Sequence, residues 1–315
     1  MKISVFGLLP FAQLIKEGFE IKGHKISNEN PDIIYSNDPR GFEKAMLLKK
    51  KYPKAYLILN VLDIPWHLSS SISQQTKLLV NNFLIKADQI SVISFKVKKD
   101  LSQFVDKEIH VIYNPTKDVF FDENIKKNNK FLFVGRANDP IKRINLVYDS
   151  LLKIKDGLKS IKICGAENPN FGNYLGYVSD QELNKLYNST KYLFLPSKAE
   201  GIGLPMIEAM ICGSVPITCS DNETAKEFLP IDFICDPNPK SIENKIEELD
   251  KEYDAKRELA FDYGRKYKEK FNKVRIAENI LSLTKDQLHK TMFLRSKYLQ
   301  QKKKLHQIYL TKQVF

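Results

Sequence analysis

The chain has 315 residues, of which 43% are hydrophobic, and it carries a formal net charge of +12. This length exceeds the usual size of one domain, so we expect two hydrophobic cores. No run approaches about 18 consecutive apolar residues, which excludes a membrane-spanning helix of the usual kind.

The chain begins with Met1 and runs directly into a strand pattern, with no small-residue cleavage site. We therefore expect no signal peptide. The four cysteines stand singly in apolar surroundings, without a Cys-x-x-Cys motif or a nearby histidine; they are Cys164, Cys212, Cys219 and Cys235. This pattern predicts buried free thiols in a reducing cytoplasm rather than disulfides or zinc ligands.

The first half alternates short β-rich runs with helical stretches, the pattern of a parallel sheet with helices on both faces. The predicted strands cover residues 2–6, 25–27, 32–35, 55–60, 89–93 and 108–113. The predicted helices cover residues 10–17, 41–51 and 73–86, with Gly18 closing the first. Residues 116–129 are polar and aperiodic, which indicates a linker.

The alternation then restarts, with predicted strands at 130–134, 160–164, 191–195, 214–218 and 232–235 and predicted helices at 141–155, 180–187 and 205–211. Residues 238–283 carry Ile and Leu at a period near 3.6, which predicts further helices. We expect an α/β fold with two Rossmann-like, doubly wound domains facing a cleft, residues 1–124 and 125–282, and a basic helical extension over 283–315. Ligands of such sheets bind at the carboxyl ends of the strands.

Residues 197–210 follow a predicted strand and place two carboxylates, Glu200 and Glu208, on either side of a Gly-x-Gly-x-Pro turn. Pro205 suits the start of a helix. The two glycines leave bare backbone before the helix N-terminus, where amide donors and the helix dipole favour a phosphate. One carboxylate can then reach a sugar hydroxyl pair at the nucleotide end of a ligand, and the other can reach its far end.

This segment resembles the donor-site signature of retaining, nucleotide-sugar-dependent glycosyltransferases with two Rossmann-like domains, the family 4 type of the GT-B fold. The resemblance rests on the Glu-x7-Glu spacing, the Ala-Met that follows it, and Cys-Gly-Ser-Val-Pro at 212–216. Phe-Leu-Phe-Val-Gly-Arg at 131–136, followed by Lys142, resembles the segment that clamps the donor diphosphate. Residues 174–183 resemble the loop that frames the base. The resemblance is strong over roughly residues 128–230 and weaker over 1–115.

The resemblance implies a hexosyltransferase that moves a sugar from a nucleoside diphosphate sugar to a hydroxyl, with retention of configuration. Arg136 and Lys142 would neutralise the diphosphate leaving group, although spacing alone leaves solvated surface cations open. Arg143 competes with Lys142, because the family's glycine is missing here. Glu208 would accept two ribose hydroxyls, and Glu200 would contact the transferred sugar. The co-substrate is the nucleotide sugar, and no metal is expected because no Asp-x-Asp motif occurs.

In the family, His-Asp follows the fourth strand and the histidine contacts the donor sugar. Here Asp63 matches the aspartate, Leu62 stands at the histidine position, and His67 lies five residues later. Either His67 folds back over the cleft, or its role has passed to Asp63 or Asn60. The catalytic candidates are therefore Arg136, Lys142, Glu200, His67 and Asp63. The resemblance assigns donor binding to Gly7, Gly135, Arg136, Lys142, Tyr177, Val178, Glu200, Gly201, Ile202, Gly203, Leu204 and Glu208.

Residues 285–315 hold eight Lys or Arg and one Asp, interleaved with apolar side chains. This mixture favours a basic amphipathic helix on an anionic membrane surface, and also suits a nucleic-acid patch or a partner helix. We expect a cytoplasmic protein on the membrane face, whose acceptor is a saccharide or lipid-linked saccharide of lipopolysaccharide, polysaccharide or glycolipid synthesis. The alternatives are a soluble acceptor or, with less support, a nucleic-acid-binding protein on the same fold. The nucleotide base and the sugar are not readable from the sequence.

Overall fold

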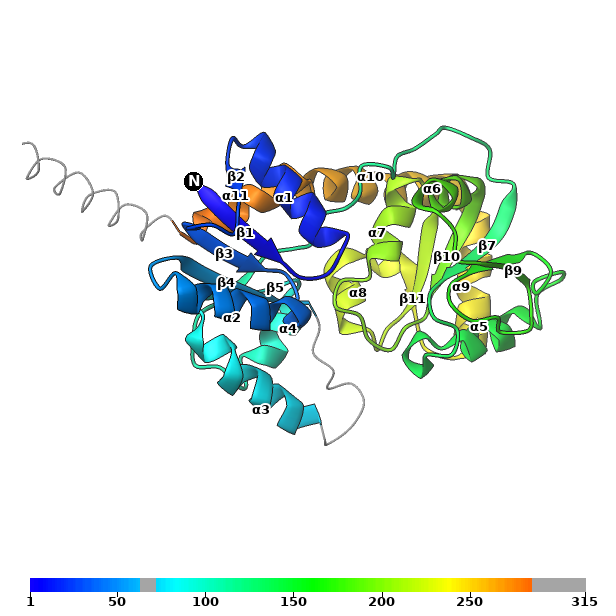
Figure 1. Cartoon of the computed structure of the whole chain (residues 1–315). Coiled ribbons are helices and arrows are strands. Elements are labelled where there is room, and N and C mark those ends of the chain that lie inside the picture. The colour runs from blue at the N-terminus through cyan, green and yellow to red at the C-terminus, as the bar shows by residue number, and fades with distance from the viewer. Residues whose placement is uncertain (63–71, 285–315) are drawn as a thin grey trace, which may run out of the picture.

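The computed structural model describes residues 1–62 and 72–284. Within them, two six-stranded sheets form two α/β domains that lie side by side (Figure 1). The strand order is β2-β1-β3-β4-β5-β6 in the first sheet and β12-β11-β10-β7-β8-β9 in the second, and neighbouring strands pair in parallel. The predicted fold class of two Rossmann-like domains is confirmed.

The first domain follows the predicted alternation closely. Its strands are β1 (Lys2–Phe6), β2 (Lys25–Ile26), β3 (Ile33–Ser36), β4 (Tyr56–Val61), β5 (Gln89–Val92) and β6 (Ile109–Val111). Its helices are α1 (Phe11–Ile21), α2 (Phe42–Lys51), α3 (Ile72–Asn82) and α4 (Phe95–Leu101). Helix α1 lies on one face of the sheet and α2 and α3 lie on the other (Figure 1). Because both faces are covered, the central strands read as apolar runs rather than alternating ones.

Two features of this domain differ from the predictions. Helix α1 continues past Gly18 to Ile21, because Gly18 serves close helix packing rather than helix termination: an added Cβ would overlap the carbonyl oxygen of Lys273. Helix α4 was not predicted. It is short, and it begins at a cap where the Ser94 hydroxyl accepts from the backbone N–H of Val97 at 3.2 Å.

The second domain contains strands β7 (Asn129–Val134), β8 (Ile161–Cys164), β9 (Asn173–Gly176), β10 (Thr190–Leu195), β11 (Val215–Cys219) and β12 (Ile234–Cys235). Its helices are α5 (Ile144–Leu151), α6 (Asp180–Ser189), α7 (Leu204–Ile211), α8 (Glu223–Phe228) and α9 (Pro239–Lys251). Strand β9 and helix α8 were not predicted. The predicted helix 141–155 is interrupted, because Arg143 adopts a left-handed conformation (φ 52°) between a 3₁₀ turn at Pro140–Lys142 and α5.

The last two helices connect the domains. Helix α10 (Tyr253–Lys270) packs on α7 of the second domain, and α11 (Lys273–Ser282) packs on α1 of the first. The chain therefore returns to the first domain at its end (Figure 1). The last helix within the predicted second domain, residues 125–282, thus contacts the first domain.

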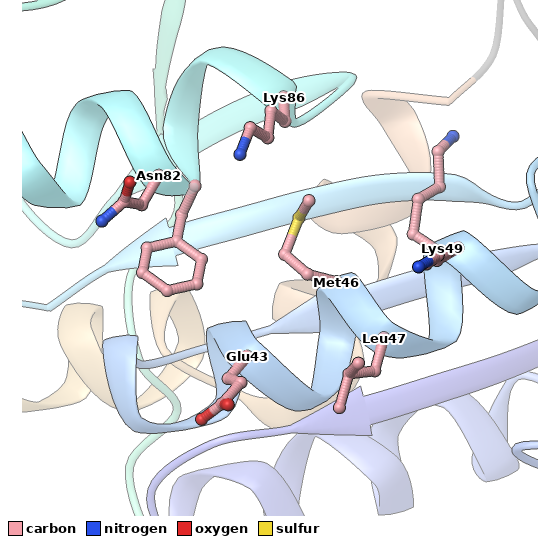
Figure 2. A pocket seen from close by; sticks show the side chains of 8 residues that line it. Glu43, Met46, Leu47, Lys49, Asn82 and Lys86 are labelled. Carbon is pink, nitrogen blue, oxygen red and sulfur yellow. The ribbon is translucent and has the colours of Figure 1, made fainter.

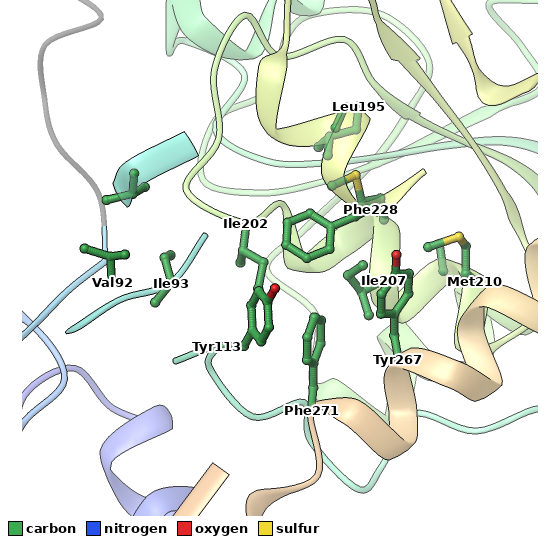
Figure 3. Close-up of a cluster of buried hydrophobic side chains, with 14 of the residues drawn as sticks. Val92, Ile93, Tyr113, Leu195, Ile202, Ile207, Met210, Phe228, Tyr267 and Phe271 are labelled. Atoms are coloured by element: carbon green, nitrogen blue, oxygen red, sulfur yellow. The ribbon is translucent and has the colours of Figure 1, made fainter. Parts of the chain in front are cut away.

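An apolar cluster joins the two domains beside the linker (Figure 3). Ile93 and Tyr113 come from the first domain, and Ile202 and Phe228 come from the second. The Tyr113 ring lies 4.9 Å from the ring of Phe271, at the end of α10, and 5.8 Å from that of Phe228. These buried contacts hold the two domains against each other.

The four cysteines are buried and free, as predicted. Of the helices in the described parts of the chain, none has the length and apolar character needed to span a membrane.

A groove of about 490 Å³ runs along α2, with Met46, Leu47, Lys49 and Lys86 among its lining residues (Figure 2). Its described lining contains none of the predicted donor-site residues.

Candidate functional site

The loop between β10 and α7 places the two predicted carboxylates. Gly203 has φ +72° and immediately precedes α7, with Pro205 in the first helical turn. A Cβ on Gly201 would lie 2.5 Å from the carbonyl oxygen of Leu62 and 2.9 Å from Ile93 Cδ1. The loop is therefore pressed against the first domain at the carboxyl ends of β4 and β5. Ile202 is buried and Leu204 is half-buried.

Lys142 and Glu200 form an ion pair, with Nζ of the lysine 2.5 Å from Oε1 of the glutamate. Only 18% and 12% of these side chains are exposed. The Lys198 N–H donates to the Ile141 carbonyl at 2.9 Å, which ties the loop of Glu200 to the turn of Lys142. The structure thus brings together the residue predicted to hold the diphosphate and the one predicted to contact the sugar. A ligand diphosphate could replace the carboxylate as the partner of the ammonium group.

The two arginines near Lys142 take different partners. Arg136, 66% exposed, lies with Nη2 2.5 Å from Asp139 Oδ2. Arg143 donates two hydrogen bonds to Asp221, at 2.9 and 2.5 Å. The sequence left both Lys142 and Arg143 as candidates to hold the diphosphate. In the structure Lys142 lies beside Glu200 and Arg143 lies beside Asp221.

Glu208 lies on the second turn of α7, where the hydroxyl of Tyr187 donates to its Oε2 at 3.2 Å. Burial raises the pKa of Glu208 to about 7, and the positive charge of Lys117 opposes this shift. Lys117 itself pairs with Asp180, the first residue of α6, at 2.5 Å. The site therefore holds a carboxyl group close to its titration point at neutral pH. Accepting hydrogen bonds from two hydroxyl groups would favour its ionised form.

The remaining predicted donor residues follow strand ends, as expected for a doubly wound sheet. Gly135 comes directly after β7, and its Cβ position lies 3.8 Å from Lys142 Cδ. Tyr177 follows β9 and is 82% exposed, and Val178 beside it is half-buried. Gly7 follows β1 with φ +124°, and an added Cβ would overlap the side chain of Asn37. Close packing on Asn37 therefore also requires a glycine at this position.

A cavity of about 210 Å³ lies beside Glu200 and contains residues that sequence reasoning missed. Lys96 lines it from the first domain, and Lys198 and Thr224 line it from the second. The Thr224 hydroxyl donates to the backbone carbonyl of Glu200 at 2.6 Å. Helices α4 and α8, which supply part of this lining, are short and were absent from the predicted elements. The Asn222 cap before α8 is the signal that could have revealed it.

His67 and Asp63 lie outside the described residues. Asn60, the third alternative for the family histidine, is buried in β4 and accepts a hydrogen bond from the Ser91 hydroxyl at 3.0 Å. Across residues 1–62 and 72–284, no group of three or more His, Cys, Asp or Glu side chains could hold a metal ion.

Residues 115–267 match the model of a family described as glycosyl transferases group 1. The chain is 30% identical over 191 residues to the O-antigen chain mannosyltransferase RfbU of Salmonella typhimurium, a match that covers 54% of each chain. It is 44% identical over 66 residues to the O-antigen chain mannosyltransferase B of Escherichia coli, which covers 21% of this chain and 17% of that protein. The chain thus spans about half of the first relative and less than a fifth of the second.

Solved structures share the fold at low identity. The Anabaena protein Alr3699/HepE in complex with UDP-glucose has a TM-score of 0.71 at 16% identity, covering 91% of this chain and all of that one. Sucrose-phosphate synthase of Thermosynechococcus elongatus has a TM-score of 0.73 at 15% identity, covering 93% and 99%. These neighbours share the arrangement of two Rossmann-like domains known as the GT-B fold.

Proposed function

We propose that this chain transfers a sugar from a nucleoside diphosphate sugar to a hydroxyl of a saccharide or lipid-linked acceptor, with retention of anomeric configuration. The observation that carries the proposal is the Lys142–Glu200 pair beside the glycine loop that opens α7. It joins a cation, a carboxylate and backbone amides at the strand ends that face the first domain. The family match and the UDP-glucose complex of a structural neighbour support it.

The transfer breaks the bond between the anomeric carbon and the diphosphate oxygen. Lys142, Arg136 and the amides near Gly203 stabilise the negative charge that develops on that oxygen. The acceptor hydroxyl forms the new bond on the same face of the sugar, and its proton passes to the leaving diphosphate. Glu200 orients the sugar, and Glu208 accepts the ribose hydroxyls. The transfer reaction described in this way needs no metal ion.

We place the acceptor in polysaccharide or glycolipid synthesis, because two relatives of this chain are O-antigen chain mannosyltransferases. In this proposal residues 285–315, which lie outside the described part of the chain, hold the protein on an anionic membrane surface. Their charge is +7 from eight basic residues and one aspartate. Each basic residue near such a surface contributes on the order of 1 kcal/mol at low salt.

The test is a panel of UDP, GDP and ADP sugars incubated with the full chain. We expect one nucleotide to raise the melting temperature and its sugar to be slowly hydrolysed. Proton NMR of the transferred sugar should then show the donor's anomeric configuration. An inverted product would contradict retention, and an absence of binding and hydrolysis across the panel would contradict the proposed activity.

A further inference from the structure

Glu227 on α8 connects the two domains through hydrogen bonds to its carboxylate. Its Oε2 accepts from the backbone N–H of Phe95 at 2.9 Å, and its Oε1 accepts from the Tyr113 hydroxyl at 3.2 Å. Both donors belong to the first domain. Phe95 is the first residue of α4, so its N–H has no partner inside that helix. The Glu227 carboxylate of the second domain therefore caps the N-terminus of α4 in the first domain.

The surroundings of Glu227 make this contact specific. Tyr113 packs edge-on against Phe228 (Figure 3). The Lys270 ammonium lies 4.5 Å from the centre of the Tyr113 ring and 3.4 Å from its hydroxyl. Burial raises the pKa of Glu227, against the effect of its hydrogen-bond donors. Moving the Glu227 carboxylate away from its two donors would leave partly buried polar groups without hydrogen-bond partners, which is unfavourable. The contact therefore favours one arrangement of the two domains.

The other charged contact between α8 and α4 is weaker. Glu223, one turn earlier on α8, lies 3.6 Å from Lys99 Nζ and 4.0 Å from Lys96 Nζ, and 52% of its side chain is exposed. Exposed ion pairs of this length contribute little to the stability of the contact between the two helices. Glu227 is therefore the polar group on α8 that defines how the helix sits against the first domain.

Helix α8 also contacts the candidate site. Thr224, on its first turn, holds the carbonyl oxygen of Glu200 at 2.6 Å, and Glu200 pairs with Lys142. The next residue, Gly201, lies directly against the Leu62 carbonyl of the first domain. A shift of α8 relative to α4 would therefore also move the Glu200 loop against the first domain.

We propose that Glu227 is a positioning residue for sugar transfer. By holding α8 to the N-terminus of α4, it sets the arrangement in which Glu200 and Lys142 face the first domain. This inference rests on the proposed function. Glu208, which is assigned to the ribose, lies on α7 and contacts the second domain's own Tyr187. Nucleotide binding should therefore survive a change at Glu227, while transfer should not.

The experiment compares Glu227→Ala and Glu227→Gln with Lys226→Gln, a control at an exposed position on the same helix. Three quantities are measured on the full chain: hydrogen exchange of the Phe95 amide, the Kd of the nucleoside diphosphate, and kcat for transfer. In Glu227→Ala we expect the Phe95 amide to exchange about tenfold faster or more, and kcat to fall by about tenfold or more. The Kd should stay within about twofold. Glu227→Gln, whose amide oxygen still accepts, should lie between Ala and wild type, and the control should match wild type.

Unchanged Phe95 exchange in both Glu227 variants would overturn the contact, and faster exchange with wild-type kcat would overturn its role in positioning. A loss of nucleotide affinity equal to the loss of kcat would show a merely structural role. If Glu227→Ala does not fold, Glu227→Gln and Tyr113→Phe, which removes one donor, test the same contact. Failure of the proposed function would look different, because wild type itself would transfer no sugar, while the amide exchange would still decide the contact.

Discussion

Replacing Glu208 with glutamine should stabilise the protein while impairing nucleotide binding. Burial raises the pKa of Glu208 from 4.5 to about 7. The unfolded chain ionises this group near its ordinary pKa, whereas the folded chain resists ionisation up to about pH 7. The resulting cost is absent below about pH 4.5, grows as the pH rises toward 7, and is constant above it. At about 1.4 kcal/mol per pH unit, it reaches at most about 3.5 kcal/mol.

The assay is thermal unfolding of wild type and Glu208→Gln at pH 5 and pH 8. Glutamine keeps an acceptor for the Tyr187 hydroxyl, which donates to Glu208 at 3.2 Å, but carries no charge to desolvate. We expect the variant's melting temperature to exceed that of wild type by a few degrees at pH 8. At pH 5 the two should differ much less. Glu247→Gln, at an exposed position on α9, is the matched control and should show no such pH dependence.

An equal gain at pH 5 and pH 8 would show that the effect is not the ionisation of Glu208. A variant less stable than wild type at pH 8 would contradict the reasoning altogether. In that case the charge of Lys117, which favours the ionised carboxylate, would outweigh burial. Either result would remove the physical basis for a carboxyl group held ready for hydroxyl ligands.

Three further results are expected. Nucleotide affinity of wild type should weaken by up to about tenfold for each pH unit below 7, as titration calorimetry can measure, because ribose binding favours ionised Glu208; in Glu208→Gln this dependence should be lost. Arg136→Ala and Lys142→Ala should each lower turnover, by about a hundredfold for the partly buried Lys142, with acceptor binding unchanged in steady-state kinetics. Removing residues 285–315 should abolish co-sedimentation with anionic vesicles at low salt and leave donor hydrolysis measurable.

Each of these has a contrary outcome. A pH-independent nucleotide affinity in wild type would separate Glu208 from the ribose. Near wild-type turnover in both Arg136→Ala and Lys142→Ala would leave the diphosphate without its proposed cations. Vesicle binding by the truncated chain, or none by the full chain, would remove the membrane role of residues 285–315.

The sheet pattern was predictable because long buried strands such as β4 and β10 carry dense apolar runs. Short elements were not. Helices α4 and α8 have seven and six residues, too few to display a helical period. Strand β9 lies at the sheet edge and is half exposed, so it lacks a buried face to mark it. The predicted elements therefore lacked α4 and α8, through which the two domains also contact each other.

The candidate site was predictable where backbone chemistry decides it. The glycine loop before α7 and the carboxylates on either side of it follow from turn and helix-start residues. The different partners of Lys142 and Arg143 were not predictable, because they depend on the left-handed conformation of Arg143 and on Asp221, 78 residues later in the chain. The interdomain bond of Glu227 to Phe95 spans 132 residues and leaves no local signal.

We propose that the Lys142–Glu200 pair and the α7 loop form a site for sugar transfer from a nucleotide donor. The most direct measurement follows the anomeric proton of a hydrolysable nucleotide sugar by NMR, with wild type and Lys142→Ala compared at equal nucleotide occupancy. We expect cleavage by wild type, with retained configuration in the transferred product, and a large loss of rate in the variant. Cleavage at the same rate by both proteins would contradict this proposal.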